Sequence, residues 1–62
     1  MKNKKWRIEI CLDFGSGLDT YLTKDRKFDN PVSEDVVRGK AWDMFPTHLL
    51  YRGAAVDVKP LD

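Results

Sequence analysis

The chain of 62 residues carries a net charge of +1, and 42% of its residues are hydrophobic and 34% charged. This length leaves room for one domain, residues 1–62, and the composition is that of a globular domain and not of a disordered chain. The near-zero net charge argues against a dedicated nucleic-acid-binding protein, which is usually much more basic. A chain this short buries only about 60% of its unfolded surface, so we expect a small core and low stability.

Cysteine content and hydropathy bear on where the protein works. A single cysteine excludes an internal disulfide and a cysteine-rich zinc site. A small domain without disulfides suits a reducing cytoplasm. The sequence has no apolar run near 18 residues and no signal peptide after its lysine-rich start. We therefore predict a complete cytoplasmic protein without a membrane segment.

Residues 5–14 alternate without a break between apolar and polar side chains. A period of two over this length predicts a long β-strand that is buried on one face. The buried face would carry Trp6, Ile8, Ile10, Leu12 and Phe14, and the opposite face Lys5, Arg7, Glu9, Cys11 and Asp13.

The glycine-rich residues 15–17 predict a β-hairpin turn. A two-residue turn would place Asp19 and Tyr21 beside the apolar face. A three-residue loop over 15–17 buries more apolar surface, and Gly17 suits the left-handed position that such loops need, so we favour it. In this register Asp13 faces Asp19, and Leu18, Thr20 and Leu22 lie opposite Phe14, Leu12 and Ile10.

Two short motifs in the same stretch suggest other functions. Asp13-Phe14-Gly15 matches a metal-binding tripeptide of kinases, and Gly15-Ser16-Gly17 could cradle a phosphate. The kinase tripeptide belongs to a domain several times longer, and a phosphate loop opens a helix, whereas this loop opens a strand. We therefore predict a turn that holds no metal and no cofactor.

A helix is predicted after a polar connection over residues 24–32. Ser33 has the character of an N-cap, and the acidic residues 34–35 suit the positive end of a helix dipole. The helix should run over about residues 34–45, because Pro46 stops it. Its apolar face would carry Val37, Ala41 and Met44, with Val36 and Phe45 at the edges.

A second alternation over residues 54–59 predicts the last strand, which Pro60 ends. Its apolar face would carry Ala54, Val56 and Val58. Residues 49–51 form either a short fourth strand or a loop. The predicted fold is α+β: a three-stranded antiparallel sheet of β-β-α-β topology and order 2-1-3, packed on one helix.

Catalysis finds little support in the sequence. His48 is the only histidine and Cys11 the only thiol, and no sequence-local base or oxyanion loop accompanies that thiol. If residues 52–53 form a tight turn, His48 would face Asp57 as a cross-strand ion pair. We therefore predict a protein without catalytic residues.

Two surface features remain. Six basic residues should gather at the open end of the hairpin beside Trp6, as a footprint for nucleic acid or an acidic protein, or as a solvated rim. Trp42 would lie opposite the apolar face of the helix, either folded over the core edge or available as an anchor for a partner. The basic residues are Lys4, Lys5, Arg7, Lys24, Arg26 and Lys27.

Three stretches together resemble the small inhibitors of bacterial RNA polymerase made by short-tailed phages, which are single β-β-α-β domains of about this size. The stretches are Lys4-Lys5-Trp6, residues 41–46 with their Trp-x-x-x-Pro spacing, and residues 56–60, Val-Asp-Val-Lys-Pro. The resemblance implies occlusion of a polymerase jaw by a sheet face with a basic pair on the last strand and an acidic residue on the first.

Only some of the functional positions of this family have the same chemistry in the present sequence. The basic pair falls on Asp57 and Lys59, and the acidic residue falls on Cys11, so that only Lys59 keeps the chemistry of the family. The stretch between Pro46 and Pro60 is longer than in the family. A related phage protein could therefore act on another host machine, such as a nuclease or a defence complex.

We predict a non-enzymatic protein-binding module, a phage-encoded inhibitor that occludes a host enzyme such as bacterial RNA polymerase. The partner would be a bacterial host protein in the cytoplasm, and the module a monomer or weak dimer. Its predicted partner-binding residues are Arg7, Cys11, Tyr21, Trp42, Asp57 and Lys59. The alternative is a small nucleic-acid-binding regulator that uses Lys4, Lys5, Trp6, Lys24, Arg26 and Lys27.

Overall fold

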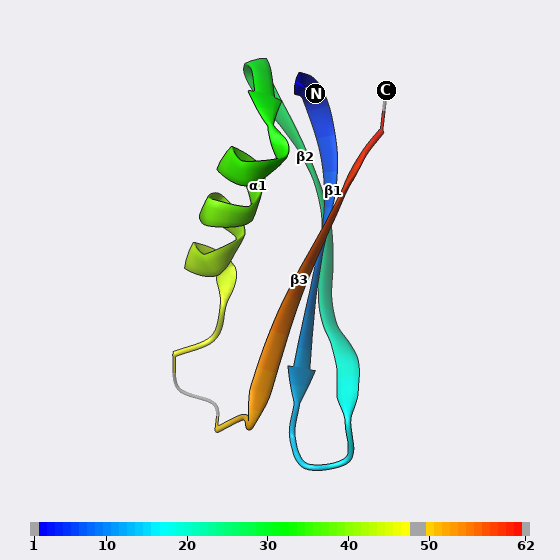
Figure 1. The fold of residues 1–62 in the computed structure, drawn as a ribbon, viewed down its shortest axis with the longest axis vertical. Helices are drawn as coiled ribbons and strands as arrows, with labels where there is room; N and C mark the ends of the chain where they lie inside the picture. The colour runs from blue at the N-terminus through cyan, green and yellow to red at the C-terminus, as the bar shows by residue number, and fades with distance from the viewer. Residues whose placement is uncertain (1, 48–49, 62) are drawn as a thin grey trace.

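The structure is a computed structural model that describes residues 2–47 and 50–61. An antiparallel sheet in the order β2-β1-β3 packs one face against α1 (Figure 1). The predicted α+β fold and strand order are confirmed. The elements are β1 (Lys2–Asp13), β2 (Leu18–Ser33), α1 (Glu34–Ala41), the 3-10 helix η1 (Trp42–Met44) and β3 (Gly53–Pro60).

Of the two alternatives for residues 49–51, a short strand or a loop, the described residues 50–51 agree with the loop. Leu50 and Tyr51 lie outside any strand, and Leu49 is outside the described residues. The backbone N–H of Arg52 instead donates to the carbonyl of Asp13 at 2.7 Å. The segment before β3 is therefore tied to the end of β1 without forming a strand of its own.

The apolar face of β1 is the centre of the core. Ile8, Ile10 and Leu12 are fully buried, as the alternation over residues 5–14 predicts. Burying each such side chain contributes about 1.5–3 kcal/mol relative to leaving it exposed. The other buried core residues are Trp6, Val37, Ala41 and Val58, with Leu22, Phe28, Val32, Met44, Phe45, Ala54 and Val56 packed around them.

Strand β2 is much longer than predicted. It continues to Ser33, so that residues 24–32 belong to a strand and not to a polar connection. The prediction was wrong because an edge strand tolerates exposed charges, which make a strand look like a loop in the sequence. Pro31 is also compatible with β2, since edge strands and bulges accept a residue that has no N–H.

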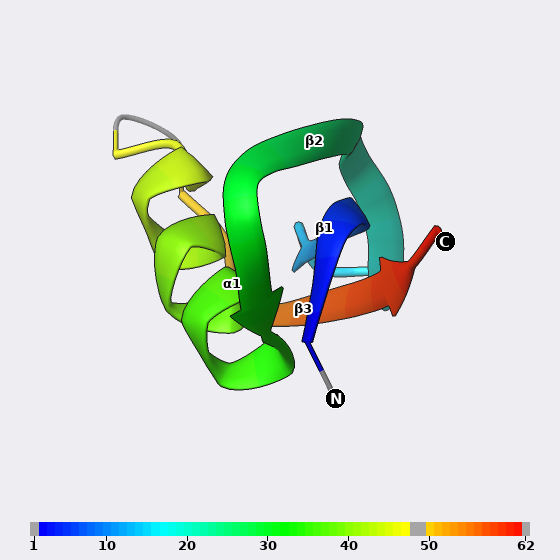
Figure 2. The ribbon, with the colours of Figure 1, turned by 90° about the horizontal axis from the view of Figure 1, so that it is seen from above.

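An irregularity in β2 wraps this strand around the start of β1. The partner of Lys5 is Lys27, whereas that of Asn3 is Val32, so the four residues 28–31 of β2 lie against the single residue Lys4 of β1. Figure 2 shows the resulting curve of β2 around β1 towards α1. Phe28, within this curve, and Val32 pack against the core, and Trp6 is only 2% exposed.

The helix ends earlier than predicted. It passes at Trp42 into η1, because Pro46 can donate no N–H to the carbonyl of Trp42, four residues before it, and its ring crowds that carbonyl. Ser33 holds the extended N-cap conformation without a side-chain capping bond. Arg38 fixes the helix to the sheet by donating from Nη1 to the carbonyl of Val56 at 2.7 Å.

The hairpin register agrees with the prediction only away from the turn. Ile10 faces Leu22 as predicted, but Tyr21 is an extra residue of β2, so Cys11 faces Thr20. The loop consequently spans residues 14–17. Nearer the turn, the shift moves each β2 side chain to the face opposite the predicted one.

Three further predictions about residues near the turn are wrong. Leu18 pairs with Asp13 and not with Phe14, and Asp19 pairs with Leu12, so the two aspartates do not face each other. Phe14 is 54% exposed and Leu18 is 55% exposed, although both were predicted in the core. The loop geometry has a local cause, which is the carboxylate of Asp13.

Asp13 closes the hairpin loop. Its Oδ1 accepts hydrogen bonds from the backbone N–H of Gly15 at 2.7 Å and of Gly17 at 3.1 Å. Both glycines have positive φ, +124° and +107°, a region that L side chains rarely adopt. The aspartate of the apparent kinase tripeptide therefore serves the turn.

We expect the Ile10→Ala variant to lose about 2 to 5 kcal/mol of unfolding free energy, because a fully buried side chain of the central strand is removed. Chemical denaturation followed by circular dichroism measures this loss. Phe14→Ala is the control, and it should change the stability little because Phe14 is half exposed. Equal losses in the two variants would contradict the assignment of the core.

We expect the Asp13→Ala variant to lose about 1–2 kcal/mol, because two backbone N–H groups of the loop lose their acceptor. Asp13→Asn keeps an oxygen at this position and should recover most of the loss. Thermal melts of the three proteins make the comparison. If Asp13→Ala melts like the parent protein, the carboxylate does not hold the loop.

Candidate functional site

The face of the sheet that points away from α1, called here the outer face, carries mainly polar side chains. No described segment covers it, and the strand register arranges its side chains in rows across the sheet. It carries Lys5, Arg7, Glu9, Cys11 and Asp13 from β1, Leu18, Thr20, Thr23, Asp25 and Lys27 from β2, and Ala55, Asp57 and Lys59 from β3.

A basic row crosses the outer face at Arg7, which faces Lys59 on β3 and Asp25 on β2. The Arg7 guanidinium donates two hydrogen bonds to the Asp25 carboxylate, from Nε at 2.8 Å and from Nη2 at 3.1 Å. These bonds raise the pKa of Arg7 and lower the pKa of Asp25. Lys59 forms no ion pair with the described residues, so its charge is available to a partner.

An acidic row lies next to the basic row. Glu9 faces Asp57 across β1 and β3. Its carboxylate accepts hydrogen bonds from the Thr20 hydroxyl at 3.3 Å and from the Cys11 thiol at 3.9 Å. Like charges directly opposite each other are destabilising, so this pair favours a cation or a hydrogen-bond donor between them.

Four predicted partner-binding residues lie together on the outer face. They are Arg7, Cys11, Asp57 and Lys59. Tyr21 is the extra residue of β2 and is 41% exposed. Glu9 belongs to the same surface but was not selected from the sequence, although the alternation over residues 5–14 placed it on the correct face.

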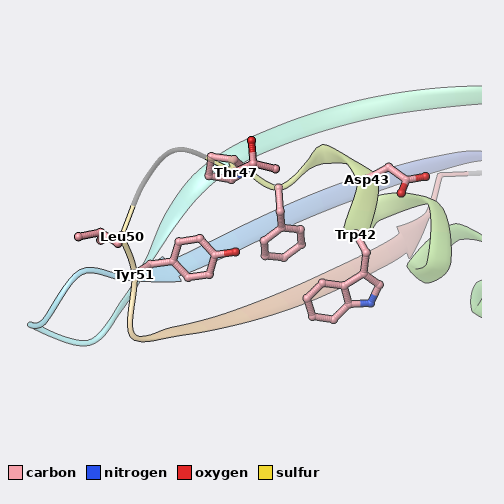
Figure 3. A pocket seen from close by; sticks show the side chains of 7 residues that line it. Trp42, Asp43, Thr47, Leu50 and Tyr51 are labelled. Carbon is pink, nitrogen blue, oxygen red and sulfur yellow. The ribbon is translucent and has the colours of Figure 1, made fainter.

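Trp42 lies apart from the outer face. It belongs to η1, is 55% exposed, and stacks on Phe45 with ring centroids 4.6 Å apart. Figure 3 shows the Trp42 and Tyr51 rings on one side of the chain and Asp43 pointing to the other. Because Phe45 packs against the core, Trp42 covers the core edge with one ring face and remains half exposed. It does not extend the outer face.

The residues of the alternative nucleic-acid site are only partly brought together. Lys5 faces Lys27 on the outer face, whereas Arg26 and Lys24 belong to the opposite side of β2. Trp6 is buried, and its indole N–H donates to the carbonyl of Asn3 at 2.9 Å, so it offers no surface on which a base could stack. Lys4 is exposed near this end.

A shallow hollow of about 430 Å³ marks this basic end. Its lining combines three basic side chains with Asp25 and an apolar residue, and Arg26 lies 4.8 Å from the centre of the Phe28 ring. Asp25, held by Arg7, reduces the positive potential there. The lining residues are Lys5, Asp25, Arg26, Lys27 and Leu61.

Within residues 2–47 and 50–61, which the structure describes, no three His, Cys, Asp or Glu side chains converge on a point where a metal ion could bind. Neither helix formed by these residues is long and apolar enough to cross a membrane. The predicted pair of His48 with Asp57 lies outside the described residues, because His48 is not among them.

Comparisons with protein-family models, with curated proteins and with solved structures find no match to this chain. The resemblance to the phage polymerase inhibitors therefore stays a prediction, which rests on the three stretches of sequence named above.

The contrast between the two tryptophans gives a direct test of this geometry. We expect the Trp42→Phe variant to show fluorescence that acrylamide quenches only weakly, because its remaining tryptophan, Trp6, is 2% exposed. The parent protein should be quenched more strongly through Trp42. If the variant and the parent protein are quenched equally, the assignment of a buried Trp6 and an exposed Trp42 is wrong.

Proposed function

We propose that this chain is a non-enzymatic protein-binding module that inhibits a host enzyme by covering part of its surface with the outer face. The observation that carries the proposal is the pair of charged rows, Arg7–Lys59 and Glu9–Asp57, side by side on an uncovered sheet. Both rows cross β1, the central strand, whose backbone is hydrogen-bonded to β2 on one side and to β3 on the other. A partner therefore meets charges at fixed spacing.

The size of the outer face suits a protein partner. A standard interface buries about 800 Å² on each partner, and this chain exposes 4433 Å² in total. Such an interface would take roughly a fifth of this surface. Rows of opposite charge select the orientation of a partner and disfavour partners with the wrong pattern more than they add raw affinity.

The resemblance to phage inhibitors suggests bacterial RNA polymerase as the partner and the bacterial cytoplasm as the place of action. Lys59 keeps the basic character that the family has on the last strand. Cys11 takes the position of the acidic residue on the first strand, but the Glu9 carboxylate lies on the same face and accepts the Cys11 thiol hydrogen bond. Asp57 still departs from the family, so another bacterial enzyme remains within the proposal.

Nucleic-acid binding is the second candidate, favoured by one observation. Lys5 and Lys27 face each other directly, and two like charges so placed are relieved by an anion such as a phosphate. The buried Trp6 and the nearby Asp25 reduce the support for this reading. Binding that weakens steeply as salt rises would favour it, because such binding releases counterions.

We expect the Lys59→Glu variant to bind purified bacterial RNA polymerase at least about tenfold more weakly, because the change adds repulsion as well as removing attraction. Surface plasmon resonance and an in vitro transcription assay measure the loss. Lys40→Glu is the matched control, since Lys40 is an exposed lysine in the last turn of α1. Its binding should stay unchanged.

Asp57→Arg reports the charge of the partner surface. It should strengthen binding where the partner presents acidic groups to this row, and weaken binding where the partner is mixed or basic. The proposal fails if Lys59→Glu is silent while the combined Lys24→Glu, Arg26→Glu and Lys27→Glu changes abolish binding. That result would favour the nucleic-acid reading, with the basic end as its site.

A further inference from the structure

The hairpin tip, residues 13–19, presents two large apolar side chains to solvent. Phe14 is 54% exposed and Leu18 is 55% exposed. The tip lies at the end of the molecule opposite the two termini (Figure 1). Scattered apolar residues on a surface are ordinary, so exposure alone assigns no role to this pair. Three further observations do.

The first observation is continuity with the outer face. The register shift at Tyr21 pairs Leu18 with Asp13, and Asp13 pairs with Gly53 on its other side. Leu18 therefore lies on the outer face, on the same side of the sheet as the two charged rows of the proposed interface. Without the shift, its side chain would belong to the face that packs against α1.

The second observation is that the tip is held in place before any partner arrives. The Asp13 carboxylate binds the N–H groups of Gly15 and Gly17, and the Asp13 carbonyl accepts from Arg52 N–H at 2.7 Å. All three strands therefore meet at this residue or next to it. An apolar surface that is already ordered loses less conformational entropy on binding, so more of its burial appears as affinity.

The third observation is charge. Residues 8–23 contain Glu9, Asp13 and Asp19 but no lysine or arginine, whereas the other end of the hairpin is basic. The distal half of the hairpin is thus acidic, with Arg52 bordering it on the β3 side. A pocket that accepts Phe14 would match this surface if its walls were apolar and its rim carried lysine or arginine.

We propose that Phe14 and Leu18 are the apolar anchor of the interface made by the outer face, and that they insert into an apolar, basic-rimmed pocket on the same partner protein. This inference rests on the proposed function. Interfaces concentrate their affinity in a few well-packed apolar or aromatic residues, while surrounding charges supply orientation. The outer face supplies such charges, and the tip supplies the apolar pair.

Photo-cross-linking tests the proposal with the full chain in a bacterial lysate. The probe p-benzoyl-L-phenylalanine replaces Phe14 at the tip, Ala55 on the outer face, or Val36 on α1, in three separate proteins. Ala55 faces Cys11 on the outer face, two residues from the pair of Gly53 with Asp13, and Val36 is 44% exposed. The expected result is that the probes at positions 14 and 55 label one and the same protein and the probe at position 36 does not.

The position of the cross-link supplies a second requirement. The adduct from position 14 should map by mass spectrometry to an apolar pocket bordered by lysine or arginine in the labelled protein. Labelling from position 55 alone, or an adduct outside such a pocket, overturns the anchor and leaves the proposed function standing. Labelling from position 14 without labelling from position 55 overturns both the anchor and the proposed function. The absence of any labelling also overturns both. Cross-links to a second copy of this chain overturn the anchor as well.

Affinity measurements with the purified labelled protein complete the test. Phe14→Ser and Leu18→Ser should each weaken binding about tenfold or more. Both side chains are half exposed, so thermal melts should show that the fold is kept. Val36→Ser is the matched control and should bind like the parent protein. Unchanged affinity in the two tip variants overturns the proposal.

Discussion

The apolar face of β1 is the constraint on which the other elements depend. β1 pairs on both sides, and its buried side chains fill the space between the sheet and α1. One helix of Glu34–Ala41 is too short to cover this face alone. The cover is completed by β2, which curves around Trp6 through the irregularity at residues 28–31, and by η1 with Phe45. The polar segment 24–32 therefore helps to enclose the core as part of β2.

Covering only one face of the sheet has a direct consequence for function. A strand that alternates between apolar and polar residues buries one set and leaves the other set in rows at the spacing of the strands. In this chain most of the uncovered set is charged, and the basic row next to the acidic row results from the pairing of β1 with β3. The stability of the core and the arrangement of the proposed binding face thus arise from the same alternation.

Asp13 and the extra residue Tyr21 connect the turn to the surface in a similar way. The carboxylate of Asp13 stabilises a loop over residues 14–17, and the extra residue in β2 accommodates that loop without disturbing the register at Ile10. The result is that Leu18 leaves the core side. The domain gives up the burial of two apolar residues at its tip, and a binding role for these residues would explain why the small core does without them.

The sequence by itself determined the central strand, the helix start, the last strand and the order of the sheet, because these depend on periodicity and on local signals that act within a few residues. It also placed Arg7, Cys11, Asp57 and Lys59 on one face, since alternation is a local property. Tertiary structure decided the rest. The strand character of residues 24–32 depends on pairing with β1, which charged edge residues do not reveal. The exposure of Phe14 and Leu18 depends on the loop over residues 14–17 and on the extra residue Tyr21, which shifts the register by one residue. A shift of one residue is enough to exchange the two faces of a strand.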